Sequence, residues 1–224
     1  MSASILEELF VHLQRVPAED LEFLDDEHVD WLPRIRILRP QMAIQEIRRA
    51  VEASPNGPEC RLRVAWLYCW LLSRQKICPW LLIRFHVDLM EVDIRELMRD
   101  LASALQSNPR RHTTIRVKHE RGTYYACLIN NYADPAYRQC RVMFLVLWHN
   151  QRFAAAYAGT NEELRALTTA LHVALRGERV EMLLGLHADL DAAYSAGCQD
   201  VAGTCLFRSD SSTSNLARLF WHFD

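Results

Sequence analysis

The sequence is poor in glycine, proline and lysine. Its 224 residues include 7 glycines and 8 prolines, and no glycine precedes Gly57. Phosphate loops of nucleotide-binding proteins are built from glycine, so the chain lacks the material for those motifs. Lysine occurs only as Lys76 and Lys118, and arginine, whose planar guanidinium suits phosphate and carboxylate groups, supplies the remaining basic charge. The scarcity of glycine and proline favours a helix-rich fold.

Long apolar runs and paired cysteines are also missing. No uncharged apolar stretch reaches the ~18 residues that a membrane-spanning helix needs. The first eight residues, MSASILEE, contain no basic residue, so we expect neither a membrane span nor a secretory signal. The 7 cysteines include no Cys-x-x-Cys pair. This pattern favours free thiols in a reducing compartment over a disulfide framework.

The charge is balanced overall but uneven along the chain. Half of the residues are apolar and the formal net charge is −2, which excludes a disordered chain. Residues 76–150 carry 11 basic and 7 acidic residues, whereas the segments on either side are acidic. The middle of the chain is therefore the part best suited to an anionic partner, although an ordinary solvated surface has the same mild excess.

The first 75 residues show helical periodicity throughout. Apolar spacing predicts a helix capped by Ser4, a second over residues 17–28, and a third from Pro40 to the turn at residues 54–58. A fourth helix, over residues 59–74, is apolar almost all round and is expected to be buried. These features predict a small helical bundle.

The period changes in the second part of the chain. The pattern predicts short helices over residues 79–85 and 188–195 and longer helices over residues 94–105 and 160–177. It also predicts a hairpin of residues 113–119 and 123–129 that turns at Arg121–Gly122. Further strands are expected at residues 141–148, 152–157 and 180–186. Because Val142–Leu147 is continuously apolar, we expect a central strand covered on both faces.

The predicted fold class is therefore α+β. It comprises an all-helical domain over residues 1–76, an α+β domain with an antiparallel sheet over residues 77–208, and a Ser-rich linker with an apolar tail over residues 209–224.

Catalytic and metal-binding motifs are absent from the sequence. Cys60, Cys69 and Cys78 recur every nine residues, a spacing that fits core positions better than the close pairs of a zinc site. His119 and His149 lie at predicted strand ends, where a pairing with Cys127 or Cys140 would make a Cys/His hydrolase. Ordinary core or surface positions explain these residues better, so we expect no enzyme, no cofactor and no metal.

A basic cluster is the clearest candidate for a binding surface. Five basic residues fall on one loop and one face of the predicted hairpin, where phosphates could be reached: Arg110, Arg111, Arg116, Lys118 and Arg121. Four tryptophans lie in apolar segments and are expected in the core rather than stacked on bases: Trp66, Trp70, Trp80 and Trp148.

A series of short motifs extends over residues 5–200. They are Glu7, Arg15 and Val16-Pro17 in the first helix, Glu22-Phe23-Leu24, Ala43-Ile44-Gln45, Gln75-Lys76 ahead of Trp80, the 94–105 helix before the hairpin, Tyr137-Arg138 before the apolar strand, and a closing helix before residues 180–184. In their order and spacing, the chain resembles the N-terminal portion of the centromere protein N family, subunits of the inner kinetochore.

This resemblance implies a fold and a function. The fold is a pyrin-like (death-fold) helical domain followed by an α+β domain shared with centromere protein L. The function is non-enzymatic binding of the centromeric nucleosome in the nucleus during chromosome segregation. The implied partners are the nucleosome or its DNA, centromere protein L and other inner-kinetochore subunits, with no membrane and no small-molecule substrate.

The resemblance also assigns residues. Glu7 is the implied contact to the centromeric histone variant, and the implied phosphate contacts are Arg15, Arg39, Lys76, Arg95, Arg99 and Arg138. Two departures reduce the expected affinity: Ala3 stands at a second acidic position, and Glu162 and Glu163 stand at basic positions. The family's C-terminal region, which pairs with centromere protein L, has no counterpart in these residues. The alternative function is a death-fold adaptor that joins proteins without contacting DNA.

Overall fold

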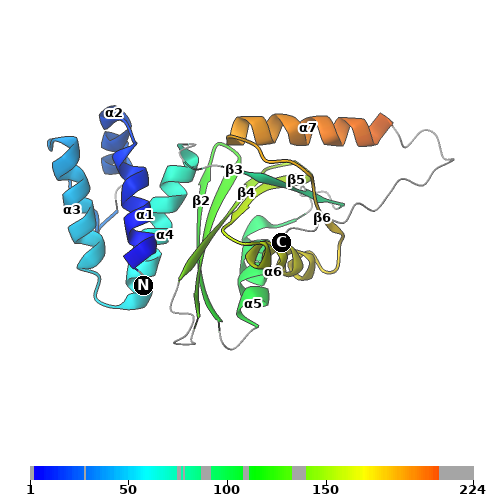
Figure 1. Ribbon diagram of the computed structural model, residues 1–224, viewed down its shortest axis with the longest axis horizontal. Coiled ribbons are helices and arrows are strands. Elements are labelled where there is room, and N and C mark those ends of the chain that lie inside the picture. Colours follow the sequence, from blue (N-terminus) through cyan, green and yellow to red (C-terminus); the bar gives the residue numbers. More distant parts are fainter. Residues whose placement is uncertain are drawn as a thin grey trace, which may run out of the picture.

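A six-stranded antiparallel sheet with helices on both faces forms the centre of the computed structural model (Figure 1). The structure describes residues 3–27, 29–74, 77, 79–86, 92–107, 111–132 and 140–206. The strand order is β2-β3-β4-β5-β1-β6, and every pairing is antiparallel. The fold class is α+β, as predicted.

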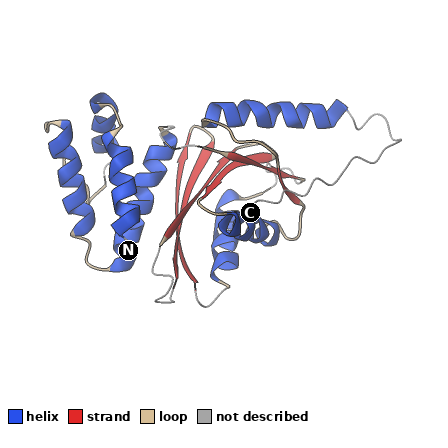
Figure 2. Ribbon diagram, in the orientation of Figure 1, coloured by secondary structure: helices blue, strands red, loops and turns tan. Residues whose placement is uncertain are grey.

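The described residues up to 74 contain helices and loops but no strand (Figure 2). The elements are α1 (Ala3–Gln14), α2 (Ala18–Leu21), the 3₁₀ helix η1 (Glu22–Glu27), α3 (Pro40–Glu52) and α4 (Gly57–Ser73). Ser4 lies inside α1, so its predicted capping role is wrong. The single helix predicted over residues 17–28 is also wrong, because the second half tightens into η1. There the Asp25 carboxylate accepts hydrogen bonds from the backbone N–H groups of Ile35 and Arg36, both at 2.8 Å.

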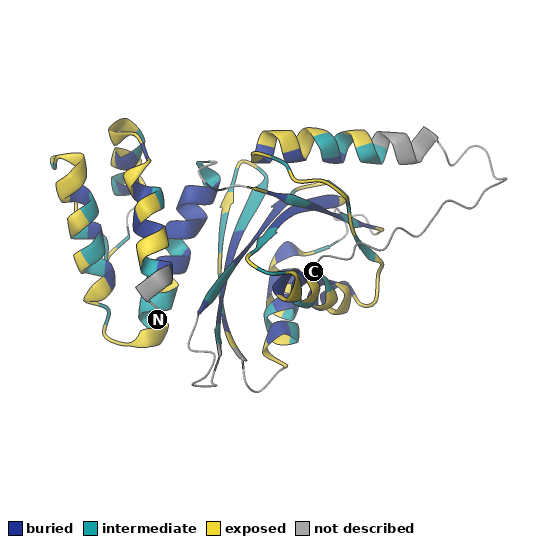
Figure 3. Ribbon diagram, viewed as in Figure 1, coloured by how far each residue is buried: buried dark blue, intermediate teal, exposed yellow. Residues whose placement is uncertain are grey.

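Helix α4 joins the other helices to the sheet. The Asn56 side chain caps it by accepting a hydrogen bond from the Glu59 backbone N–H at 2.8 Å. The Tyr68 hydroxyl donates to the Ile5 carbonyl of α1 at 3.3 Å, while its ring lies 5.2 Å from the Phe144 ring in the sheet. The apolar core is therefore continuous from α1 through α4 to the sheet, and Figure 3 shows α4 largely buried.

The strands are β1 (Leu81–Phe85), β2 (Arg111–Glu120), β3 (Thr123–Tyr132), β4 (Arg141–Trp148), β5 (Phe153–Ala158) and β6 (Val180–Met182). The helix predicted over residues 79–85 is wrong, because these residues form β1 between β5 and β6. Five apolar residues are too few to show a helical or a strand period, and their distant partners decide the outcome. The hairpin is confirmed: Arg121 and Gly122 both adopt positive φ, at 49° and 78°, as a tight two-residue turn requires.

Strand β4 is interior and covered on both faces, as predicted. Phe144 and Val146 pack on the α4 side, whereas Met143, Leu145 and Leu147 pack on the opposite side. Helices α5 (Ile94–Gln106) and α6 (Asn161–Ala174) cover that second face (Figure 1). Thr160 caps α6, as predicted, by accepting a hydrogen bond from the Glu163 backbone N–H.

Helix α7 (Leu190–Leu206) packs on the α4 side of the sheet, against β5 and β1. The short helix predicted over residues 188–195 therefore begins later and continues further. Gly197 lies directly over the Phe153 ring, where an added Cβ would come within 2.3 Å of a ring carbon. The glycine thus sets how closely α7 approaches the sheet, which sequence periodicity does not reveal.

We expect Val146→Asp to destabilise the protein strongly. The carboxylate would lie between α4 and the sheet without a partner, which lowers the free energy of unfolding by about 3 kcal/mol or more. Urea denaturation followed by circular dichroism measures this loss. Ile37→Asp, at a side chain that is 90% exposed, is the control and changes it by less than about 0.5 kcal/mol. Equal stability of both variants would contradict a two-sided core at β4.

We expect Gly197→Ala to loosen α7. The methyl group would overlap the buried Phe153 ring, and relieving this overlap costs about 1–3 kcal/mol. Amide hydrogen exchange should accelerate in α7 and remain unchanged in α4. Gly159→Ala is the matched control, because its added Cβ has an ordinary 3.5 Å contact with Glu163.

Candidate nucleic-acid interface

The structure separates the predicted phosphate-binding residues. Arg15 and Arg39 belong to the helical part, on the α4 side of the sheet, whereas Arg95 and Arg99 belong to α5 on its opposite face (Figure 1). The other two residues of the predicted set, Lys76 and Arg138, lie outside the described residues. The four described residues therefore form two separate candidate contacts.

The first contact consists of Arg15 and Arg39. Arg15 follows α1, where its backbone N–H donates to the His12 carbonyl at 3.1 Å, and Arg39 precedes α3 as its N-cap residue. Both residues are exposed, and neither forms an ion pair within the part of the chain that the structure describes. Their guanidinium groups are therefore accessible to an anionic partner without the loss of an ion pair among the described residues.

The second contact, on α5, attracts phosphate less than its two arginines alone would, because carboxylates lie beside them. Arg99 is 69% exposed, but its guanidinium lies 3.1 Å from Glu96 and 3.6 Å from Asp100. A cavity of about 250 Å³ lies beside α5. Four carboxylates line it, those of Asp93, Glu96, Asp100 and Glu178, together with Arg176. Arg95 is exposed and forms no ion pair among the described residues, so it is the better phosphate ligand of the two.

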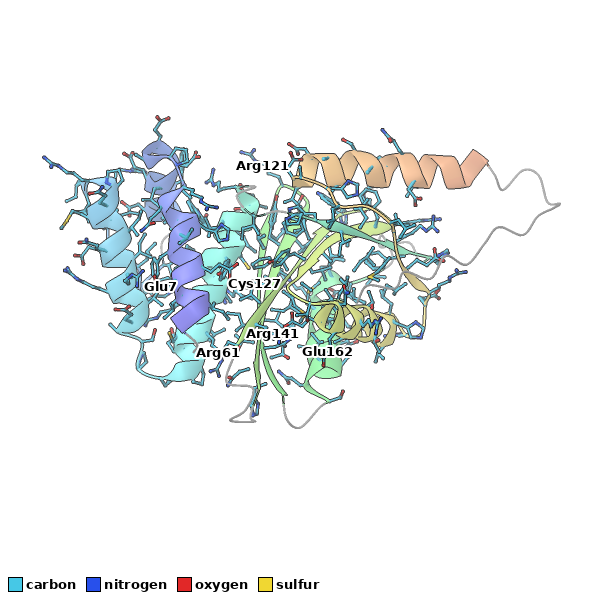
Figure 4. The ribbon with its side chains drawn as sticks, viewed as in Figure 1. Glu7, Arg61, Arg121, Cys127, Arg141 and Glu162 are labelled. Atoms are coloured by element: carbon cyan, nitrogen blue, oxygen red, sulfur yellow. The ribbon has the colours of Figure 1, made fainter. Side chains whose placement is uncertain are left out.

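Glu7 is already engaged by another helix. Its carboxylate accepts hydrogen bonds from both terminal nitrogens of Arg48 on α3, at 2.8 and 3.3 Å (Figure 4 labels Glu7). Arg48 also lies over the Phe10 ring, 4.2 Å from its centroid. The hydrogen bonds from Arg48 lower the pKa of the Glu7 carboxyl below its ordinary value. A basic partner that binds the Glu7 carboxylate must therefore compete with Arg48 for it.

The basic cluster on the hairpin is largely used within the protein. Lys118 pairs with Glu27 of η1 and lies 3.6 Å from Glu120. On the same face of β2, the Arg61 guanidinium of α4 donates to the Thr114 hydroxyl at 3.3 Å. These contacts join the helical part to the sheet. They leave Arg116 and Arg121 exposed, while Arg110 and the Arg111 side chain lie outside the described residues.

The Glu162–Glu163 pair does not form an acidic surface, contrary to the sequence-based expectation. Glu162 is exposed, but Glu163 is only 1% exposed and accepts a hydrogen bond from the Thr160 hydroxyl at 3.2 Å. The Arg141 guanidinium lies 3.8 Å from the same carboxylate. Only Glu162 therefore remains to repel a phosphate at this end of α6 (Figure 4).

Two cysteines, Cys69 of α4 and Cys127 of β3, lie in the core between a helix and the sheet, where both are fully buried. Burial raises the pKa of Cys69 to about 12 and that of Cys127 well above its ordinary value. A nucleophilic cysteine needs a lowered pKa, so Cys127 is poorly suited to that role. Within the described part of the chain, no cluster of three or more His, Cys, Asp or Glu side chains could hold a metal ion.

One groove was not anticipated from the sequence. It has a volume of about 520 Å³ and lies where the β2–β3 and β4–β5 turns meet the start of α7. Its walls include Tyr125, Trp148 and Tyr194, with Arg121 and His149 beside them. The Trp148 and Tyr194 rings lie 5.3 Å apart in an edge-to-face arrangement. Trp148 is half-buried and packs against the core rather than within it, so its predicted core position is only partly correct. Aromatic faces beside an arginine suit stacking on bases or on side chains.

Comparisons with known proteins do not identify a family for this chain. No protein-family model matches the chain, and no curated protein matches it. None of the described helices is long and apolar enough to cross a bilayer.

The Glu7–Arg48 pair predicts a specific titration. The Glu7 carboxyl should titrate below the usual range of a glutamate, because protonation breaks its hydrogen bonds with Arg48. A folded-state pKa below the unfolded value means that the pair stabilises the fold above the unfolded pKa and that this effect is lost as the pH falls through the folded pKa. NMR titration of the side-chain carboxyl measures the midpoint.

Arg48→Gln should return this midpoint to the ordinary range. Arg49→Gln is the matched control, because Arg49 lies on the same helix and pairs with Glu46 instead. A Glu7 midpoint that is insensitive to Arg48→Gln would show that the pair is not formed in solution.

Proposed function

We propose that the protein is a non-enzymatic subunit of the inner kinetochore, within the constitutive centromere-associated network, that binds centromeric chromatin and neighbouring kinetochore proteins. The observation that carries the proposal is the order of the architecture. A helical unit precedes an antiparallel sheet, and the two are joined through α4. This is the arrangement implied by the resemblance to centromere protein N, with a pyrin-like first unit and a second unit like that shared with centromere protein L.

DNA binding in this proposal relies on arginines that the fold leaves free. Arg15, Arg39 and Arg95 are exposed, without an ion pair among the described residues. Because the first two lie on the other side of the sheet from Arg95, the DNA backbone would contact two separated points rather than one basic face. Such contacts hold phosphates and carry no base information, so binding is independent of DNA sequence.

Histone recognition in this proposal is an exchange of partners at Glu7. The centromeric histone would offer an arginine that replaces Arg48 on the carboxylate. The exposed fraction of the Glu7 side chain is 64%, so a partner can approach it from solvent. Ala3 offers no second carboxylate, which makes histone recognition the weaker part of the interaction.

The adaptor alternative has less support from the packing. An adaptor unit that works alone would need α4 to tolerate solvent on its sheet-facing side. Instead, Tyr68, Cys69 and Trp70 are buried in the core that α4 shares with the sheet. The two units thus form one folded body, which favours a role that uses both.

DNA binding tests the proposal through its salt dependence. If Arg15, Arg39 and Arg95 each meet one phosphate, the logarithm of affinity should fall against the logarithm of salt concentration with a slope of about −3. Reversing Arg15 and Arg95 to Glu should weaken binding equally on unrelated DNA sequences and reduce the slope by about 2. Fluorescence anisotropy with short duplexes and with nucleosomes measures both quantities.

The matched control is Arg34→Glu with Arg165→Glu. Both arginines are exposed and outside the proposed set, and the double variant has the same change in net charge. If it weakens binding as much as the reversal of Arg15 and Arg95 does, the contact is not localised. Absence of binding at low salt would rule out the DNA role and leave protein–protein scaffolding as the function to test.

A further inference from the structure

The groove at the start of α7 has an aromatic wall that the core holds in place. The ring centroids of Trp148, Phe153 and Tyr194 lie 5.3, 5.4 and 5.8 Å from one another. Phe153 is fully buried, whereas Trp148 is half-buried and Tyr194 is 38% exposed. Trp148 and Tyr194 meet edge to face, so the ring that presents its edge keeps its own faces clear of the other. The wall therefore presents aromatic surface that needs no rearrangement before a planar ligand binds.

Two turns place basic groups beside this wall. Arg121 of the β2–β3 turn and His149 of the β4–β5 turn both line the groove, and the His149 backbone N–H donates to the Gly122 carbonyl at 2.8 Å (Figure 4 labels Arg121). Arg121 is exposed and forms no ion pair among the described residues. Its φ of 49° is uncommon for an arginine, and such backbone outliers gather at functional sites. The groove therefore offers an available positive charge next to aromatic rings.

One carboxylate also lines the groove. Asp191 is exposed in the first turn of α7. A carboxylate at this position opposes a compact ligand that carries several phosphates at one point, such as a nucleoside triphosphate. A nucleic-acid strand carries one charge per nucleotide, so it can place a phosphate at Arg121 and away from Asp191.

Charge and shape together select the ligand class. Arg121 repels a lysine or arginine side chain, and an aromatic side chain of a peptide brings no charge to match the guanidinium. A nucleotide brings a flat base and a phosphate together, and proteins bind single strands by this combination of aromatic rings and basic groups. The bases of a duplex are paired and stacked on one another, so only an unpaired base can reach the rings. The groove volume of about 520 Å³ lies within the ~300–1,000 Å³ of small-ligand sites.

We propose that this groove binds a single strand of DNA or RNA, with one unpaired base stacked on the wall formed by Trp148 and Tyr194 and its phosphate at Arg121. The site goes beyond the proposed function, in which Arg15, Arg39 and Arg95 hold the phosphates of a duplex. It does not depend on the kinetochore assignment.

Fluorescence anisotropy of the full chain with a fluorescein-labelled oligothymidylate of about 12 nucleotides tests the proposal. Tyr194→Ala should weaken binding about tenfold or more, because the base loses a stacking partner. Tyr194→Phe keeps the ring and should bind as the wild type does. Arg121→Gln should weaken binding and reduce the slope of log affinity against log salt concentration by about 0.7, the value for one phosphate of a single strand.

The matched controls are Tyr124→Ala and Arg165→Gln, which should bind the oligonucleotide as the wild type does. Tyr124 packs on the opposite face of the sheet, where its ring stacks on His119 at 4.3 Å, and Arg165 is an exposed arginine of α6. A duplex of the same length separates this site from the proposed function, because Tyr194→Ala should leave duplex binding unchanged.

Three results would overturn the proposal. The first is no binding of the oligonucleotide by the wild type at low salt, and the second is equal binding by the wild type, Tyr194→Ala and Arg121→Gln. The third is displacement of the oligonucleotide by an equal nucleotide concentration of thymidine monophosphate, because the ligand is then a free nucleotide. Failure of duplex binding alone would count against the proposed function and leave this site standing.

Discussion

A helix without a polar face cannot lie at the surface, and this constraint on α4 shapes the rest of the structure. Its buried residues include Val64, Leu67, Tyr68, Trp70 and Leu71, which lie on several sides of the helix. Helices α1 and α3 cover one side, and strands β2 and β3 cover the other. Burial at ~25 cal/mol per Å² of apolar surface makes this arrangement the main source of cohesion between the two parts. The helical unit and the sheet are therefore parts of one core, although the sequence divides them by periodicity.

The same packing determines which charges are free. Where the helical part meets the sheet, Lys118 pairs with Glu27, and between α1 and α3, Arg48 pairs with Glu7. These partners are 91 and 41 residues apart in the chain, so no local pattern reveals them. Counting basic residues along the sequence consequently overestimates the surface that can attract phosphates.

The features that the sequence predicted are those determined by neighbouring residues. The Arg121–Gly122 turn specifies its hairpin, and the unbroken apolar run of β4 requires cover on both faces. Strand β1 was misassigned because its partners, β5 and β6, lie about 70 to 100 residues later. The aromatic groove was missed for the same reason, since Tyr125, Trp148 and Tyr194 come from three elements that only the folded sheet brings together.

Part of the arginine-rich composition has a structural explanation. Arg48 lies over Phe10, Arg63 over Trp31, and Arg74 over Phe23, with distances of 4.2, 5.3 and 4.8 Å from the ring centroids. Arginine performs this role better than lysine, because its planar, weakly hydrated guanidinium stacks on aromatic faces while still donating hydrogen bonds. All three pairs lie within the helical part, where they bind separate helices and loops together. Internal packing therefore accounts for these three arginines, and the phosphate contacts that we propose fall to arginines that contact neither a ring nor a carboxylate.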